Sequence, residues 1–340
     1  MKKSLLLIIL SIVSFNVTHA DITWKLSDDG TLTISGTDMP DYFDIDAQRG
    51  VAPWYREVSK INKIVIEDGV TNIGTGAFQS CYNATSVTIP KSVTSIGDAA
   101  FMGCSQLTSI TVPNSITRIG RQTFRSCMAL TSFTIPDNVT SIGENAFMAC
   151  KSLTSITIPN SVTNIDEFAF IGCMGLTTIT ISNSVTSIGE SAFDGCLNLA
   201  SIVIPNSVTE IKTHTFNGCW NLASVTIPSS VKIIRDEAFS YCSALTSVTN
   251  LATTPQEIGA RSFHKYGTLH VLPGCKAAYE AAEYWKNFTI VEDAVDIQSE
   301  TTGIADAKAD NGMKDGKYIV GGKLVIVKNG KKFNLNGIAE

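Results

Sequence analysis

Residues 153–173 read Leu-Thr-Ser-Ile-Thr-Ile-Pro-Asn-Ser-Val-Thr-Asn-Ile-Asp-Glu-Phe-Ala-Phe-Ile-Gly-Cys, and units of this form follow one another every 23 residues from about Ile61 to Leu245. Two residue types mark the register, because each recurs eight times at that interval. They are the cysteines Cys81, Cys104, Cys127, Cys150, Cys173, Cys196, Cys219 and Cys242 and the phenylalanines Phe78, Phe101, Phe124, Phe147, Phe170, Phe193, Phe216 and Phe239. Eight copies without an insertion predict a repeat solenoid, in which each unit stacks only on its neighbours.

Within one unit, the spacing of the apolar residues indicates how the chain turns around the core. Residues 153–158 alternate apolar with small polar side chains, which predicts a half-buried strand, and residues 159–161 supply a turn. Val162 and Ile165 then face the core from a short extended segment. Residues 166–173 carry apolar side chains three positions apart, which predicts a short helical or 3₁₀ turn. No unit can cover its own apolar edge, so the strands must stack into a parallel sheet with a spacing of about 4.8 Å.

This pattern resembles the BspA-type leucine-rich repeat family, whose bacterial members carry units of the form Leu-Thr-Ser-Ile-Thr-Ile-Pro-x-Ser-Val-Thr-x-Ile-Gly-x-x-Ala-Phe-x-x-Cys. The resemblance implies a right-handed leucine-rich repeat superhelix, mainly β with short helical turns. One position departs from the pattern. Gly120 of one coil is replaced by Asp166, Lys212 and Arg235 in others, so we expect that this position does not require the backbone region open only to glycine.

The N-terminus has the three regions of a cleavable signal peptide. Two lysines precede an apolar run over residues 4–15, and small residues then lead to Ala20, directly before Asp21. The run is too short to span a bilayer, and no later stretch reaches the roughly 20 apolar residues that a transmembrane helix needs. We therefore predict a chain exported to the extracellular space or the cell surface without a transmembrane segment, and attachment to the outer membrane stays open.

The repeat pattern fails after Val248, because Asn250 stands where a core aliphatic residue belongs and Phe263 is one residue late. Terminal repeats are expected to be atypical, since they end the stack with a polar face. The last residues contain strand patterns and a hairpin turn at Asn329-Gly330. Their ending, Lys-Asn-Gly-Lys-Lys-Phe-Asn-Leu-Asn-Gly, resembles the C-terminal sorting domains of type IX secretion cargo in the Bacteroidetes, which implies a secretion or anchoring signal.

The chain is thereby divided into six predicted segments. They are a signal peptide (1–20), an N-terminal capping β segment similar to that of the same family (21–60), the solenoid (61–250), a C-terminal cap (251–293), a polar linker (294–315) and a small β module (316–340).

The composition excludes two classes of partner. Hydrophobic residues make up 44% and charged residues 17% of the chain, which is typical of a folded protein. The net charge is -5, and nucleic acids and anionic membrane surfaces both bind a basic face. We therefore expect no nucleic-acid partner.

Eight cysteines in an exported chain could form disulfides, but their spacing favours free thiols. Residues at one position of successive coils point the same way, so the sulfur atoms lie side by side and do not face each other as a disulfide requires. The row is therefore predicted to consist of buried thiols that pack as small hydrophobic groups. Tetrahedral metal binding is disfavoured for the same reason. Cys275 lies outside the row, so partial exposure stays open for it, and an unreactive structural thiol is the favoured interpretation.

No residues form a recognisable catalytic, metal or cofactor site. The histidines that follow the signal peptide are His214, His264 and His270, and none stands in a readable Ser/His/Asp or Cys/His arrangement. His214 replaces surface residues of other coils and is expected to be solvated. The chain is therefore predicted to be non-enzymatic and to bind no cofactor.

Outward strand positions carry short hydroxylated side chains in two ladders. Among them are Ser109, Thr111, Thr134, Thr157 and Thr180. Threonine suits a solvated sheet face, so these residues could be purely structural. They could also form a flat contact surface for a protein or glycan, as the surfaces of other solenoids do, or an array that orders water and binds ice.

Partner specificity is expected where the coils differ from one another. The position after each cysteine varies most, and Tyr82 and Trp220 are its aromatic members and the best candidate anchors. Arg118, Arg121 and Arg125 form a basic cluster in one coil. Either set could instead be ordinary solvated surface.

The predicted function is adhesion. The family that the repeats resemble includes surface adhesins, which implies a binding protein for host extracellular matrix, other cells or glycans. The alternative is a rigid spacer or a glycan-binding surface component.

Overall fold

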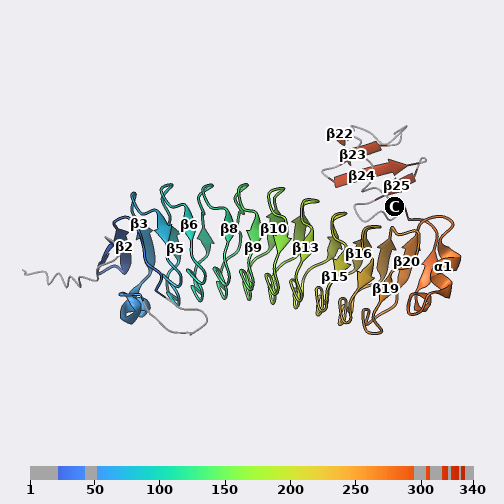
Figure 1. Cartoon of the computed structure of the whole chain (residues 1–340), viewed down its shortest axis with the longest axis horizontal. Helices are drawn as coiled ribbons and strands as arrows, with labels where there is room; N and C mark the ends of the chain where they lie inside the picture. Colours follow the sequence, from blue (N-terminus) through green and yellow to red (C-terminus); the bar gives the residue numbers. More distant parts are fainter. Residues whose placement is uncertain are drawn as a thin grey trace, which may run out of the picture.

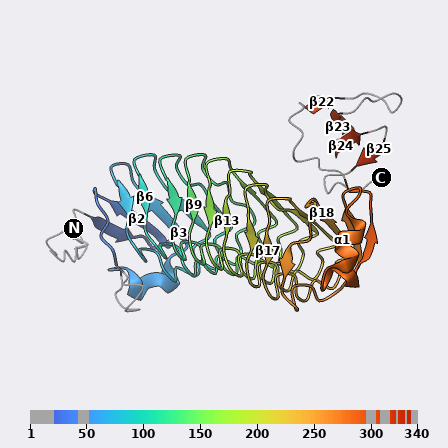
Figure 2. The ribbon, with the colours of Figure 1, turned by 45° about the vertical axis from the view of Figure 1, so that its right-hand side comes forward.

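The structure is a computed structural model that describes residues 22–42 and 52–294 and, as backbone strands, residues 304–306, 316–320, 323–328 and 331–333. The predicted signal peptide lies outside the described residues. The described residues between 22 and 294 form a long stack of coils, with β2 near one end and α1 at the other (Figures 1 and 2). The predicted repeat solenoid is therefore confirmed.

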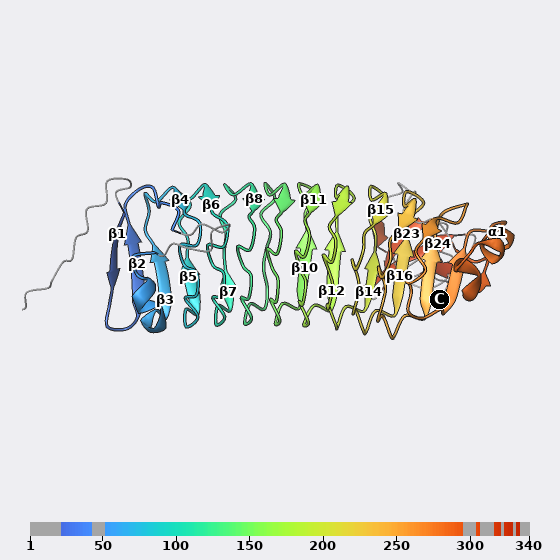
Figure 3. The same ribbon diagram turned by 60° about the horizontal axis from the view of Figure 1, so that its bottom comes forward.

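The strands of the stack fall into two rows, which run along its length one above the other in Figure 3. The first row contains β1 (Thr23–Leu26), β2 (Thr31–Ser35), β3 (Lys63–Ile66), β5 (Ser86–Thr88), β7 (Ser109–Ile110), β10 (Ser155–Ile158), β12 (Thr178–Ile181), β14 (Ser201–Val203), β16 (Ser224–Ile227), β18 (Ser247–Asn250), β20 (Thr268–Val271) and β21 (Thr289–Val291). The second row contains β4 (Asn72–Ile73), β6 (Ser95–Ile96), β8 (Arg118–Ile119), β9 (Ser141–Ile142), β11 (Asn164–Ile165), β13 (Ser187–Ile188), β15 (Glu210–Ile211), β17 (Ile233–Ile234) and β19 (Glu257–Ile258).

Neighbouring coils pair in register, as the constant repeat length requires. Ser155 of β10 pairs with Thr178 of β12, and Asn164 of β11 pairs with Ser187 of β13, both in parallel ladders. Only β1 runs antiparallel to its neighbour, β2, among the described strands of the stack. The first row is interrupted between β7 and β10, where Phe133 takes a position that isoleucine holds in the adjoining coils and packs between Phe124 and Phe147.

The third side of each coil is built from turns. Local N–H to C=O bonds span three residues, as from Cys150 to Phe147, and alternate with bonds to the next coil, as from Phe147 to Ala169. Asn145 and Ala149 have φ angles of 57° and 59°. These left-handed residues prevent the predicted 3₁₀ turns from joining into a helix, because a helix needs consecutive residues with negative φ.

The phenylalanines form a continuous column inside the stack. Each ring from Phe78 to Phe239 lies parallel to the next, and the column continues to Phe263, with centroid separations between 5.0 and 5.8 Å. Trp54, from the turn before the 3₁₀ helix η1 (Tyr55–Lys60), stacks on Phe78 and donates its indole N–H to the Ala77 carbonyl at 2.8 Å. An aromatic side chain thus covers the first coil.

The cysteines form a second column, and all nine are free and buried. From Cys104 to Cys242, each thiol of the row lies 3.1 to 3.4 Å from a phenylalanine carbonyl of the preceding coil and donates to it. The prediction of buried thiols is confirmed for the row. Cys275 is also buried, at 7% exposure, so the alternative of partial exposure does not hold.

We expect the row of thiols to be chemically silent in the folded chain. Burial raises the pKa of Cys81, Cys127 and Cys173 to about 12, and only the thiolate reacts with disulfide reagents. Titration with a chromogenic disulfide at pH 8 should therefore detect no rapid thiol in the native chain and nine after unfolding in guanidinium. Several thiols that react within seconds in the native chain would contradict this packing.

The glycine that recurs before the turns allows close packing there and is not explained by its φ angle. Gly189 has no positive φ, as the exchange to Asp166 in an adjoining coil led us to expect. A Cβ atom added at Gly189 would lie 2.3 Å from the backbone nitrogen of Glu167. The backbones of adjacent coils therefore approach each other closely at Gly189.

The stack continues beyond the point where the sequence pattern fails. β20 and β21 extend the first row and β19 extends the second, and α1 (Lys276–Ala281) and η2 (Trp285–Asn287) close the end. Asn250 is fully buried in a core position, and its amide exchanges hydrogen bonds of 2.7 and 2.9 Å with Gln256. A buried amide costs little when both its donor and its acceptor are satisfied, which explains how this coil tolerates asparagine.

The C-terminal part contains a separate sheet of four strands in the order β22 (Ile304–Asp306), β23 (Gly316–Val320), β24 (Lys323–Lys328) and β25 (Lys331–Phe333). β23, β24 and β25 are antiparallel neighbours, and β22 is parallel to β23. β22 lies within the segment predicted as a linker.

Candidate functional site

The first row of strands presents a hydroxylated face to solvent. Ser109, Thr111, Thr134, Thr157 and Thr180 are all exposed. Within the described part of the chain, the hydroxyl groups of these five residues have no hydrogen-bond partner. They are therefore available to water or to a ligand.

A neighbouring threonine column has a structural role instead. Thr108 donates its hydroxyl to the Thr85 carbonyl at 3.3 Å, and Thr131 and Thr154 repeat this bond to the coil before them at 3.4 Å. The threonine of this column is thus explained by stacking. The exposed hydroxyl face does not extend to β16, where Thr226 is only 1% exposed.

Exposed apolar side chains gather at the turn after the cysteine. Tyr82, Met128, Met174 and Trp220 all follow a buried cysteine directly, and their exposed fractions are 41%, 41%, 41% and 56%. The structure therefore places both aromatic candidates, Tyr82 and Trp220, on one edge of the solenoid. We refer to these four residues as the apolar edge.

Sequence reasoning missed a further exposed aromatic residue, Tyr241. It precedes a cysteine instead of following one, is 59% exposed, and stacks on His264 with a centroid separation of 5.3 Å. The signal was present in the sequence, because the corresponding position holds glycine, alanine or serine in the other coils, as in Gly218.

The predicted basic cluster is partly neutralised by neighbouring acids. Arg118 forms an ion pair with Asp98 at 2.7 Å, and Arg121 forms one with Glu144 at 3.3 Å. Arg125 is half-buried. These pairs reduce the positive potential that an anionic ligand would need.

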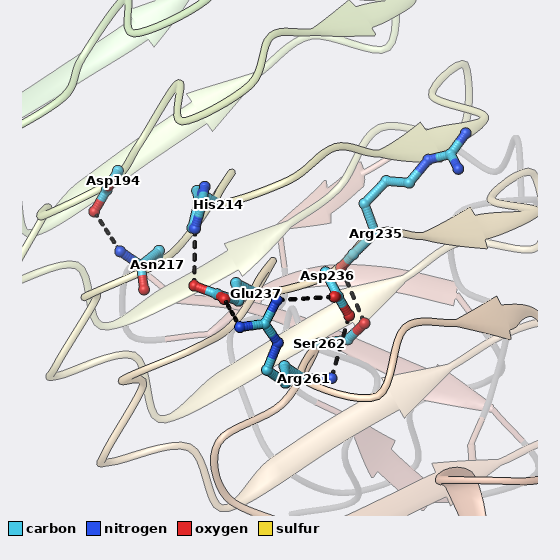
Figure 4. Close-up of polar contacts among 8 residues, drawn as sticks. All are labelled: Asp194, His214, Asn217, Arg235, Asp236, Glu237, Arg261 and Ser262. Carbon is cyan, nitrogen blue, oxygen red and sulfur yellow. Dashed lines mark hydrogen bonds and ion pairs between the residues drawn. The ribbon is translucent and has the colours of Figure 1, made fainter.

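The largest polar network links the last coils of the array (Figure 4). Glu237 lies 2.8 Å from the His214 imidazole and 2.7 Å from the Arg261 guanidinium, which also contacts Asp236 at 3.2 Å. His214 is therefore paired, whereas the sequence led us to expect simple solvation. Arg261 faces the two carboxylates of the adjoining coil, and His214 contacts one of them from the coil on the other side, so the network joins three successive coils.

Two further polar pairs lie between the last coils. Asp194 accepts a 2.9 Å hydrogen bond from the Asn217 amide, and burial raises the pKa of this aspartate despite that bond. His270 lies 2.7 Å from Asp293.

The described residues contain no group of three or more His, Cys, Asp or Glu side chains arranged to hold a metal ion. In the same part of the chain, no helix has the length and apolar character to cross a membrane.

The stacked parallel strands, the aromatic column and the 23-residue register together define a leucine-rich repeat solenoid. Comparison with protein families gives the particular family. The "BspA type Leucine rich repeat region" matches residues 54–177 and 163–275, with six copies, and the chain belongs to this family. No curated protein matches the sequence.

Several solved structures resemble the chain. A leucine-rich repeat protein from Bacteroides ovatus has a TM-score of 0.54 at 25% identity, over 76% of this chain and 71% of that one. A leucine-rich cell surface protein from Faecalibacterium prausnitzii has a TM-score of 0.38 at 24% identity, over 76% and 100% of the two chains. The T. pallidum leucine-rich repeat protein has a TM-score of 0.42 at 26% identity, over 66% and 87%. The first of these supports the repeat fold along most of the chain.

Proposed function

We propose that this chain is an exported, non-enzymatic binding protein of the cell surface, which acts as an adhesin by holding an extracellular protein or glycan against its coils. The observation that carries the proposal is the apolar edge. Of the eight exposed large apolar side chains among the described residues, four project from this one edge: Tyr82, Met128, Met174 and Trp220. Exposed apolar groups gathered on one surface of a soluble protein mark contact sites.

Two other features support this role. The exposed hydroxyl face carries no charged side chain along β7, β10 and β12. A partner can therefore dock there without removing water from a charged group of this chain. Export rests on the predicted signal peptide, and the C-terminal sheet is the proposed sorting or anchoring element. Members of the partner class include host matrix proteins, glycans and the surfaces of other cells.

Binding of the purified chain to immobilised extracellular-matrix proteins and to a glycan array tests the proposal. We expect saturable binding to at least one of these ligands. Replacing both Tyr82 and Trp220 with alanine should weaken it by about tenfold or more, since aromatic anchors carry much of the contact energy. Tyr55→Ala is the matched control, because Tyr55 is aromatic and 47% exposed but precedes the first cysteine of the row and is not one of the four residues of the apolar edge.

A rigid spacer is the alternative function. The uninterrupted aromatic column favours the spacer function, because it packs each coil against the next and so resists bending of the stack. The spacer function would be favoured, and the adhesin function rejected, if the chain bound no protein and no glycan but its deletion abolished display of another component at the cell surface.

A further inference from the structure

Tyr241 stands at a backbone position that disfavours its side chain. Its φ angle is 55°, in the left-handed region. The equivalent residues of the other coils also have positive φ and are glycine or small: Ser80, Gly103, Ser126, Ala149, Gly172, Gly195 and Gly218. A bulky residue in this region is strained, and such strain tends to occur where the side chain serves a function.

The strained residue is also the most exposed large apolar side chain in the described part of the chain, and Trp220 is the next. Ser243 connects the two: its N–H donates to the Tyr241 carbonyl at 3.0 Å and its hydroxyl to the Trp220 carbonyl at 3.2 Å. The Tyr241 ring lies nearly parallel to the His264 imidazole, at an angle of 22°. Three rings from three consecutive coils thus occupy one turn region.

We propose that Trp220, Tyr241 and His264 form an aromatic platform that binds a linear glycan. This inference rests on the proposed binding function and names its site and its ligand class.

The polar groups beside the platform suit a saccharide. Asn198 and Asn221 lie one residue beyond the apolar edge position on adjoining coils, both exposed, and the Asn221 amide donates to the Asn198 carbonyl at 3.0 Å. That bond leaves the Asn198 amide nitrogen without a partner among the described residues. A pyranose ring presents C–H groups on its face and hydroxyls at its rim, so it can stack on an aromatic ring while amides bind the hydroxyls.

The dimensions also favour a glycan over a protein. Two large rings that are a little over half exposed, together with His264, offer roughly 300 Å². A stable protein interface needs about 800 Å² from each partner. The platform is one residue wide, with polar residues beside it, whereas a sugar chain is itself narrow. The Tyr241 and His264 rings stack on each other, so one sugar unit stacks on Trp220 and the glycan continues along the edges of the other two rings, across coils about 4.8 Å apart.

The experiment compares the full chain with Trp220→Ala, Tyr241→Gly and the control Tyr55→Ala on an array of linear glycans. We expect the unaltered chain to bind at least one glycan saturably, and Trp220→Ala and Tyr241→Gly each to weaken that binding about tenfold. Tyr55→Ala should bind as the unaltered chain does. Tyr241→Gly should also raise the melting temperature, because glycine relieves the left-handed strain. A gain in stability together with a loss of binding separates a ligand-contacting residue from a structural one.

Several outcomes would overturn the platform. They are the absence of any bound glycan, undiminished binding by the Trp220→Ala and Tyr241→Gly variants, and a lower melting temperature for Tyr241→Gly. Binding to an extracellular protein without any glycan binding rejects the platform but leaves the proposed function in place. Binding to neither class rejects both.

Discussion

Raising the pH from 8 to 10 should unfold this protein, because the buried cysteine row cannot ionise in the folded state. Burial raises the pKa of Cys81, Cys127, Cys173 and Cys242 from 9.0 to about 12, and it raises the pKa of the other four thiols of the row well above 9.0. In the unfolded chain the thiols release their protons above about pH 9, while the folded chain retains them. The unfolded state therefore binds fewer protons in this range, and stability falls as the pH rises.

The expected size of this effect is large. Each thiol whose pKa is raised to about 12 contributes a loss of about 1.4 kcal/mol at one pH unit above its unfolded pKa, so these four thiols lose about 6 kcal/mol at pH 10 and the other four act in the same direction. That loss is comparable to the whole stability of an ordinary domain. Burial raises the pKa of Tyr42 to about 12 and also raises that of Tyr279, so these groups act in the same direction at still higher pH.

Denaturant unfolding monitored by circular dichroism between pH 7 and pH 10 measures how the free energy of unfolding changes with pH. Cys150→Ala provides the control. It should be less stable at pH 7, because it leaves a cavity, but its slope above pH 9 should be smaller by about 1.4 kcal/mol per pH unit. Stability that stays level from pH 8 to pH 10 would show that the thiols are not buried as described.

Phe147→Ala should destabilise the chain by about 3 to 5 kcal/mol. Phe147 is fully buried, and its ring lies 5.4 Å from Phe124, 5.2 Å from Phe170 and 5.0 Å from Phe133. Alanine would remove the contacts of the aromatic column on both sides at once. The backbone of the coil would still hold its bonds to its neighbours, so the gap could close only in part.

Chemical denaturation measures the loss, and hydrogen exchange locates it. Because each coil contacts only its neighbours, the amides of the coils beside Phe147 should lose protection first, and the array should unfold in two parts. Met128→Ala, at a side chain 41% exposed, should change stability by less than about 0.5 kcal/mol. A similar small change for Phe147→Ala would contradict the stacked core.

The sequence was sufficient to predict the first row of strands and the buried thiols, because both follow from a strict period. Ser155–Ile158 alternates exposed and buried residues as the pattern requires. The turn at residues 166–173 was harder to predict. An apolar spacing of three arises both from a 3₁₀ helix and from separate three-residue turns, and only the φ angles of residues such as Phe168 distinguish them.

The end of the array and the platform residue escaped prediction for different reasons. Phe263 falls one residue late, yet it stacks on Phe239 because the segment around the Asn250–Gln256 pair absorbs the extra residue. Such compensation depends on three-dimensional contacts. Tyr241 was not predicted as an anchor because it precedes a cysteine, whereas the most variable position follows the cysteine; its departure from the small residues of the other coils is nevertheless visible in the sequence.

The orientation of the strands has a mechanical consequence. The strands lie across the long axis of the stack, and among the described residues every cysteine is free, so no disulfide ties one coil to another. A pull applied at the two ends would therefore open each parallel ladder like a zipper, a few hydrogen bonds at a time. Each coil that opens would release roughly 80 Å of extended chain from a segment that spans about 4.8 Å when folded. In the proposed role as an adhesin, the protein would therefore extend under load before the attachment breaks.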